Sequence, residues 1–106
     1  AVVCIGCTLP DADDPEQLWN DILDKKYSIS RMPESRFDHD LYYDPDRNAE
    51  DKTYTTLAGH IDDFVFDRER FGYTQEKAAK LSRSQQMVLQ TAYKAVESAG
   101  LLGSDN

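Results

Sequence analysis

The sequence predicts an α/β segment that contains a buried first strand, several capped helices and one long irregular loop. Three observations support this prediction. Residues 2–7 form a continuous apolar run, which is typical of a strand covered on both faces. Residues 15–26 and 82–100 repeat apolar side chains at helical spacing after capping residues. Residues 27–51 lack any such periodicity.

Composition limits the class of protein. A length of 106 residues suffices for one small domain, and 40% hydrophobic residues is low for a packed core. The 20 acidic and 12 basic residues give a net charge of −8, which disfavours nucleic acid as a partner because phosphates are repelled. No apolar run approaches the roughly 18 residues of a membrane span, and no signal-peptide pattern is present. We therefore expect a cytoplasmic protein without a membrane span.

The first strand is predicted from the run Val2-Val3-Cys4-Ile5-Gly6-Cys7. A buried strand needs hydrogen-bonding neighbours on both edges. The remaining sequence offers one further strand-like stretch, at residues 53–61. The chain is therefore expected to be one piece of a larger domain.

A helix is predicted to begin at Pro15, because Asp14 suits the cap position and proline suits the first turn. Its apolar stripe includes Trp19, for which we expect core packing. The helix is expected to fade near residues 25–26, two lysines that suit a helix C-terminus.

Residues 27–51 are predicted to form a long irregular connection, rich in proline, aspartate and aromatic residues. Loops longer than about 15 residues are uncommon unless they are functional or pinned to another surface. Phe37 and Tyr42 are among the aromatic residues suited to such pinning.

Two more helices are predicted near the C-terminus. Thr74 suits the cap of a short helix that Ser82 interrupts. Ser82 and Gln85 match a capping box, and the longest helix follows until Gly100. Three alanines on one face of this helix favour the close approach of another backbone.

Cys4 and Cys7 match the C-x-x-C spacing of zinc ribbons and thiol oxidoreductases. Zinc requires a second pair of ligands, and a redox pair belongs at a helix start rather than in a strand. Residues three apart on a strand also point to opposite faces. Buried, reduced thiols are therefore predicted.

Asp44, Asp46 and Asn48 fit the first three ligand positions of an EF-hand loop. The sixth position is Ala49 rather than glycine, and the twelfth is Thr55 rather than glutamate. We expect a solvated acidic loop rather than a calcium site.

His39 and His60 are the only histidines, and no serine or cysteine lies beside either in a nucleophile-elbow motif. No catalytic triad can be named from the sequence. We predict no catalytic, cofactor-binding or metal-binding residue in this chain.

Three blocks of sequence, in order along almost the whole chain, share the motifs of one enzyme family. The first block contains Gly6-Cys7, Pro10, Asp14-Pro15 and Trp19. The second contains Met32-Pro33, Ser35-Arg36-Phe37-Asp38, Leu41-Tyr42-Tyr43-Asp44-Pro45-Asp46, Lys52-Thr53-Tyr54-Thr55, Gly59, Ile61 and Phe66-Asp67. The third contains Phe71-Gly72-Tyr73-Thr74, Ala78, Leu81, Gln85, Leu89, Ala92-Tyr93, Ala95, Glu97 and Ala99-Gly100-Leu101. Through these blocks the chain resembles the N-terminal segment of a β-ketoacyl synthase, the condensing domain of polyketide and polyunsaturated-fatty-acid synthases.

The resemblance implies a thiolase-like layered fold in a multidomain acyltransferase, built as a homodimer or pseudo-dimer. Residues 1–106 would be the N-terminal fragment of one ketoacyl synthase domain, without an internal domain boundary. The implied reaction is a decarboxylative Claisen condensation of an acyl thioester with malonyl-carrier, in polyketide or fatty-acid biosynthesis and thus lipid metabolism. The implied partners are the rest of the domain and an acyl carrier protein that bears phosphopantetheine; no cofactor is implied within this segment.

The resemblance also implies that the chain is inactive alone. The cysteine nucleophile and the two histidines of the family lie beyond Asn106, and Cys7 matches a structural cysteine. Two departures from the family pattern are Cys4, where glycine is common, and residues 82–86, Ser-Arg-Ser-Gln-Gln, where many members have Asp-Pro-Gln-Gln-Arg. A non-catalytic homologue of the chain-length-factor type is one alternative. A free-standing acidic interaction module is another, against which the unpaired first strand argues.

Overall fold

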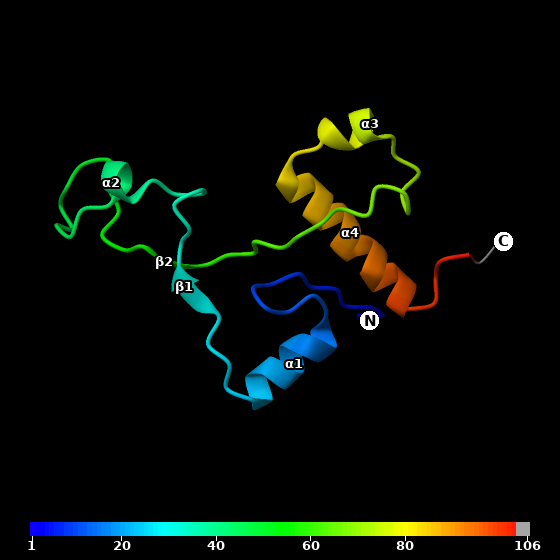
Figure 1. Ribbon diagram of the computed structural model, residues 1–106. Coiled ribbons are helices and arrows are strands. Elements are labelled where there is room, and N and C mark those ends of the chain that lie inside the picture. The colour runs from blue at the N-terminus through cyan, green and yellow to red at the C-terminus, as the bar shows by residue number, and fades with distance from the viewer. Residues whose placement is uncertain (104–106) are drawn as a thin grey trace.

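The computed structural model describes residues 1–103 and confirms a mixed α/β segment. The elements are α1 (Pro15–Leu23), β1 (Ile29–Arg31), α2 (His39–Tyr42), β2 (Leu57–Gly59), α3 (Gln75–Ala79) and α4 (Arg83–Ser98). The molecule measures 59 × 40 × 23 Å along its principal axes. Figure 1 shows α1, the β1–β2 pair and α4 spread apart, joined by extended segments.

The starts of α1, α3 and α4 are those that the sequence predicts. The Asp14 carboxylate accepts a hydrogen bond from the Gln17 backbone N–H at 2.8 Å, and Pro15 is the first residue of α1. Thr74 caps α3 in the same way. At α4, Ser82 and Gln85 form both hydrogen bonds of the capping box. Each cap satisfies backbone N–H groups that the first helical turn leaves without a partner.

The helix ends also agree with the sequence, with one small shift. Gly100 follows α4 with a φ of 69°, the left-handed conformation that glycine adopts without strain. Helix α1 ends at Leu23, before the two lysines, because Lys25 takes a φ of 55°.

The two strands form an antiparallel pair in which Ile29 lies opposite Gly59 and Arg31 opposite Leu57. Strand β2 lies inside the stretch predicted as strand-like. Strand β1 and helix α2 lie in residues 27–51, for which the sequence predicts no regular structure. That prediction is wrong, because elements of three and four residues are too short to show a period. Strand β1 also depends on a distant partner, since Ser30 pairs with Ala58, 28 positions later in the chain.

The apolar run at residues 2–7 is extended but is not a strand, and the prediction of a buried strand is wrong for this chain. Val2, Val3 and Ile5 are 82%, 72% and 66% exposed. A strand exists only through hydrogen bonds to a neighbour, and no other part of residues 1–103 lies alongside this run as a strand.

One point of the run lies directly on α4. A β-carbon placed on Gly6 would stand 2.7 Å from the Thr91 carbonyl oxygen and 2.9 Å from the β-carbon of Ala95. The Thr8 and Thr91 hydroxyls also share a hydrogen bond of 2.6 Å. The expected close approach of a backbone to the alanine-bearing face of α4 is thus confirmed at Ala95.

The buried core is small. Among residues 1–103, the buried side chains are Ala12, Ala78 and His39. Trp19 is 60% exposed, so the prediction that it packs in a core is wrong here, because nothing in the described chain covers its face of α1. Within these residues no helix has the length and apolar character needed to cross a bilayer.

Four aromatic side chains, Phe66, Phe71, Tyr73 and Tyr93, contact one another and form a cluster. Phe66 stacks on Phe71 at 5.2 Å between ring centroids, and Phe71 meets Tyr93 edge-on at 5.2 Å. Tyr93 lies on α4, so this cluster joins the segment before α3 to the long helix. Offset and edge-on ring pairs contribute about 0.5–1.5 kcal/mol beyond their area burial.

Candidate functional site

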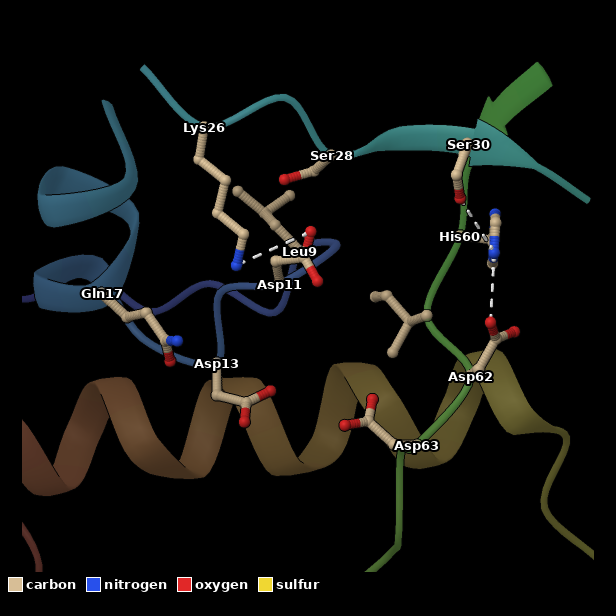
Figure 2. A pocket seen from close by; sticks show the side chains of 11 residues that line it. Leu9, Asp11, Asp13, Gln17, Lys26, Ser28, Ser30, His60, Asp62 and Asp63 are labelled. Atoms are coloured by element: carbon tan, nitrogen blue, oxygen red, sulfur yellow. Dashed lines mark hydrogen bonds and ion pairs between the residues drawn. The ribbon is translucent and has the colours of Figure 1, made fainter. Parts of the chain in front are cut away.

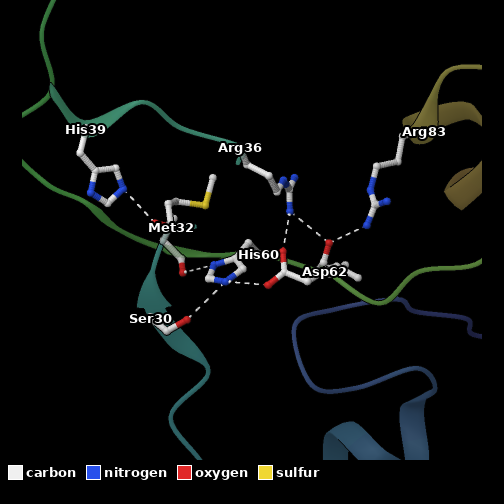
Figure 3. Close-up of polar contacts among 9 residues, drawn as sticks. Ser30, Met32, Arg36, His39, His60, Asp62 and Arg83 are labelled. Atoms are coloured by element: carbon white, nitrogen blue, oxygen red, sulfur yellow. Dashed lines mark hydrogen bonds and ion pairs between the residues drawn. The ribbon is translucent and has the colours of Figure 1, made fainter. Parts of the chain in front are cut away.

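Polar side chains from distant parts of the chain meet around His60, immediately after β2 (Figure 3). Antiparallel pairing places Ser30 of β1 beside this position. Asp62 follows two residues later, and Arg36 and Arg83 reach the same point from the turn before α2 and the first turn of α4. We call these five residues the His60 network.

Serine, histidine and aspartate are the residue types of a nucleophilic triad, so the geometry of the three in the network decides whether they can act as one. The Asp62 carboxylate lies 3.1 Å from His60 Nε2, and the Ser30 hydroxyl lies 3.5 Å from the same nitrogen. His60 Nδ1 contacts the Ala58 carbonyl at 3.2 Å. A triad needs the carboxylate on one ring nitrogen and the nucleophile on the other. The His60 network therefore cannot relay a proton from serine.

The network instead fixes the backbone at Ile61. Arg83 donates to the Ile61 carbonyl at 2.6 Å, and Arg36 donates to the same oxygen at 3.1 Å. Arg36 also contacts the Asp62 carboxylate at 3.3 Å. Two guanidinium groups on one carbonyl, with a carboxylate beside them, hold the exit of β2 against the start of α4 (Figure 3).

A hollow of about 450 Å³ lies between this point, α1 and the loop before α1 (Figure 2). Four aspartates line it: Asp11, Asp13, Asp62 and Asp63. Among the described residues, Lys26 is the one lysine or arginine in its lining, and it lies 3.8 Å from Asp11. This polar, acidic lining does not suit an acyl chain.

The other histidine, His39, is 6% exposed and held by hydrogen bonds on both ring nitrogens. Arg31 donates to Nδ1 through two guanidinium nitrogens, at 3.1 and 2.6 Å. Because a guanidinium cannot accept a hydrogen bond, Nδ1 is the acceptor and Nε2 donates to the Met32 carbonyl at 2.9 Å. The Glu34 carboxylate lies 3.2 Å from Nδ1. With both nitrogens occupied, His39 joins β1 to α2 and is not placed as a base.

Both cysteines are free and half-buried, so the prediction that they are buried core thiols is wrong in its burial. Burial raises the pKa of Cys7, the nearby Asp14 carboxylate raises it further, and Lys94 lowers it in part. A raised pKa leaves less thiolate, which is the nucleophilic form.

The acidic stretch at residues 44–48 uses its oxygens locally. The Asp44 carboxylate accepts from the Asp46 backbone N–H at 2.9 Å, and the Asp46 carboxylate accepts from the Asn48 N–H at 3.0 Å. Aspartate side chains make such bonds to a backbone N–H two residues further along the chain in many turns. Across residues 1–103, no three or more histidine, cysteine, aspartate or glutamate side chains converge as metal ligands do.

Comparison with known proteins gives one consistent result. Residues 1–106 match the family model described as "Beta-ketoacyl synthase, N-terminal domain". A PKS-NRPS hybrid synthetase of Aspergillus niger is 37% identical over 102 residues, which are 94% of this chain and 6% of that protein. One polypeptide of a phenolphthiocerol/phthiocerol polyketide synthase from Mycobacterium tuberculosis is 38% identical over 103 residues, 95% of this chain and 7% of that protein.

A solved structure agrees with the sequence relatives. The oxazolomycin ketosynthase domain of Streptomyces albus JA3453 superimposes with a TM-score of 0.78 at 31% identity, over 91% of this chain and 17% of that chain. The present chain therefore spans about 6 to 7% of the length of the two curated relatives.

Proposed function

Because this chain belongs to the β-ketoacyl synthase family, we propose that it serves as the N-terminal part of a ketosynthase domain in a polyketide-type synthase. The observation that carries the proposal is the superposition on a ketosynthase domain at a TM-score of 0.78. The domain joins an acyl thioester to a malonyl unit on a carrier protein; carbon dioxide leaves and a carbon–carbon bond forms. Acyl transfer of this kind proceeds through a covalent thioester on an activated cysteine.

Within that reaction the chain supplies scaffold rather than chemistry. Cys7, which matches a structural cysteine of the family, has a raised pKa. Both ring nitrogens of His39 are occupied, and the serine and aspartate beside His60 share one nitrogen. These observations support the proposal that the nucleophile and the groups that stabilise the developing enolate belong to another part of the domain.

The exposed apolar side chains support the same proposal. Val2, Val3 and Ile5 line one such surface, and Trp19 and Ile22 of α1 line a second. Burial of a side chain of this size contributes about 1.5–3 kcal/mol. The remainder of the domain is the proposed cover for both surfaces, and residues 2–7 become a strand when neighbouring strands are present.

The proposed assembly has further members. The domain pairs as a homodimer or pseudo-dimer, and an acyl carrier protein delivers substrates on its phosphopantetheine arm. Its place is the cytoplasm, and its products belong to polyketide or fatty-acid biosynthesis. A chain with net charge −8 repels an acidic carrier, so the carrier docks on another part of the synthase or on isolated basic residues of this chain, such as Arg68, Lys77 and Lys80.

The test compares the chain alone with the whole synthase that contains it. Each is incubated with a radiolabelled acyl thioester and malonyl-carrier, and carbon dioxide release and protein-bound label are measured. We expect turnover from the whole synthase and none from the chain. Turnover by a chain in which Cys4 and Cys7 are both replaced by alanine would contradict the proposal.

The same experiment separates the alternative functions. A whole synthase that folds but never carries label on a cysteine is the non-catalytic, chain-length-factor type of homologue. A monomeric chain that melts sharply, as a stable domain does, is an independent interaction module.

A further inference from the structure

The segment between β2 and α3 runs beside α4 without forming a helix or strand of its own. Figure 1 shows it leaving β2 and crossing the long helix before it turns toward α3. We call residues 61–70 the strap. Since it makes no ladder hydrogen bonds, the partners of its backbone groups decide how it is held.

Side chains of α4 supply those partners at two points. Arg83 donates to the Ile61 carbonyl at 2.6 Å. Further along the helix, the Gln90 amide accepts from the Asp67 backbone N–H at 2.9 Å and donates to the Val65 carbonyl at 3.4 Å. The single Gln90 side chain thus satisfies one donor and one acceptor of the strap.

A third contact lies at the far end of the strap. The Arg70 guanidinium lies 3.6 Å from the Glu97 carboxylate of α4 and 5.3 Å from the centre of the Tyr93 ring. At the near end, Arg83 also lies over the Phe64 ring at 5.6 Å. A cation therefore joins the strap to the helix at each end.

The three helix residues that hold the strap, Arg83, Gln90 and Glu97, are spaced seven residues apart. Seven residues span nearly two helical turns, so positions at this spacing share one face with a drift of about 20° per step. The rise between them is about 10 Å. The strap contacts them in the order Ile61, then residues 65–67, then Arg70, so it passes this face from the N-terminal toward the C-terminal end of α4.

We propose that α4 fastens the strap through this row of polar side chains, and that the strap unfastens as one unit while α4 stays folded. The two parts are stabilised differently. The helix has its capping box and its own backbone ladder, whereas the strap contacts of Arg83, Gln90 and Glu97 are exposed polar contacts, which are individually weak. Local opening takes place where buried contacts are few.

Unfastening would alter the acidic hollow. Ile61, Asp62 and Asp63 belong both to the strap and to the lining of the hollow (Figure 2). The Phe71–Tyr93 contact, just beyond the strap, holds the far end to α4 at 5.2 Å. Release of the strap therefore opens one wall of the hollow, and the Phe71–Tyr93 contact limits how far the strap can move from α4.

The test is hydrogen exchange, measured by peptide mass spectrometry on the whole natural protein that carries this chain. The main variant is Gln90→Met, which keeps an unbranched side chain of similar length and removes both hydrogen bonds to the strap. The matched control is Gln86→Met, on the same helix, which removes a hydrogen bond to the Ala78 carbonyl of α3 instead. A second variant, Arg83→Pro, removes the Arg83 hydrogen bond to Ile61 and leaves that of Arg36 in place. Proline suits the first helical position, so the helix start is kept.

We expect Gln90→Met to speed exchange in residues 62–71 about tenfold, with α4 unchanged, because two hydrogen bonds are lost. Arg83→Pro should speed exchange in the same peptide, and Gln86→Met should leave it unchanged. The proposal is overturned if the strap exchanges as fast in the parent as in Gln90→Met, if α4 and the strap accelerate together, or if the control matches the main variant. Arg83→Pro changes a different contact of the strap. If Gln90→Met fails to fold, the exchange rate of the strap in Arg83→Pro still tests the proposal.

Discussion

Replacement of Gly6 by alanine should detach the N-terminal run from α4. The added β-carbon would lie 2.7 Å from the Thr91 carbonyl oxygen and 2.9 Å from the Ala95 β-carbon. The first of these neighbours is backbone in the middle of a 16-residue helix, so it cannot move without strain on the helical ladder. Residues 2–8 must therefore shift outward.

The expected cost follows from these distances. Inserting a carbon into a packed contact destabilises a protein by about 1–3 kcal/mol. An outward shift also threatens the hydrogen bond of 2.6 Å between the Thr8 and Thr91 hydroxyls, and such a bond contributes about 0.5–1.5 kcal/mol. The two costs are alternatives, because a shift of residues 2–8 relieves the clash and loses the hydrogen bond. We therefore expect Gly6→Ala to lower the free energy of unfolding by about 1–3 kcal/mol.

Urea titration of the whole natural protein, followed by circular dichroism, measures this difference. Gly59→Ala is the matched control, because its β-carbon would meet only the Pro10 ring, at 3.3 Å. The control should cost less than Gly6→Ala. An unchanged urea midpoint for Gly6→Ala, or an equal loss in the control, would refute close packing of residue 6 on α4.

Three further predictions concern thiols, metals and cooperativity. Because the pKa of Cys7 is raised, its alkylation by iodoacetamide should reach half its maximal rate at a higher pH than that of an ordinary cysteine. Asp14→Asn, which still caps α1, should lower this pH, and Lys94→Met should raise it; opposite shifts would contradict the assigned causes. Thermal melts with and without chelator should coincide, and a metal-dependent rise would revive a site at Cys4 and Cys7 or at Asp44. The isolated 106-residue chain should melt broadly, since its described part has a small buried core, and a sharp two-state transition would count against a scaffold role.

Helices α1, α3 and α4 could be predicted from the sequence because their signals are local. Asp14, Thr74 and Ser82 each bond a backbone N–H three residues away, and that spacing is visible in the sequence itself. Gly100 ends α4 through its own backbone conformation. Neither signal depends on the rest of the fold, so both survive in any arrangement of the chain.

The strand pair and the His60 network could not be predicted, because both depend on contacts between distant residues. Ser30 and His60 meet only because the register of β1 and β2 places Ser30 opposite Ala58. Strands of three residues are too short to indicate a register by alternation. The spacing of Arg83, Gln90 and Glu97 is visible in the sequence, yet the strap residues that they contact lie 19 to 27 positions earlier in the chain.

The first strand was mispredicted for a different reason. Its apolar composition favours burial, but a segment is buried and paired as a strand only where other elements cover it and hydrogen-bond to it. In this chain, capping side chains accept hydrogen bonds from the free backbone N–H groups at the helix starts. The large apolar side chains lack such partners, since Val2, Ile5 and Trp19 remain largely exposed. What the chain lacks is thus apolar cover and strand edges rather than local structure, and a layered domain that packs sheet against helix provides both. Because its helix starts are satisfied locally, a segment with so small a core can still superimpose on a ketosynthase domain along 91% of its length.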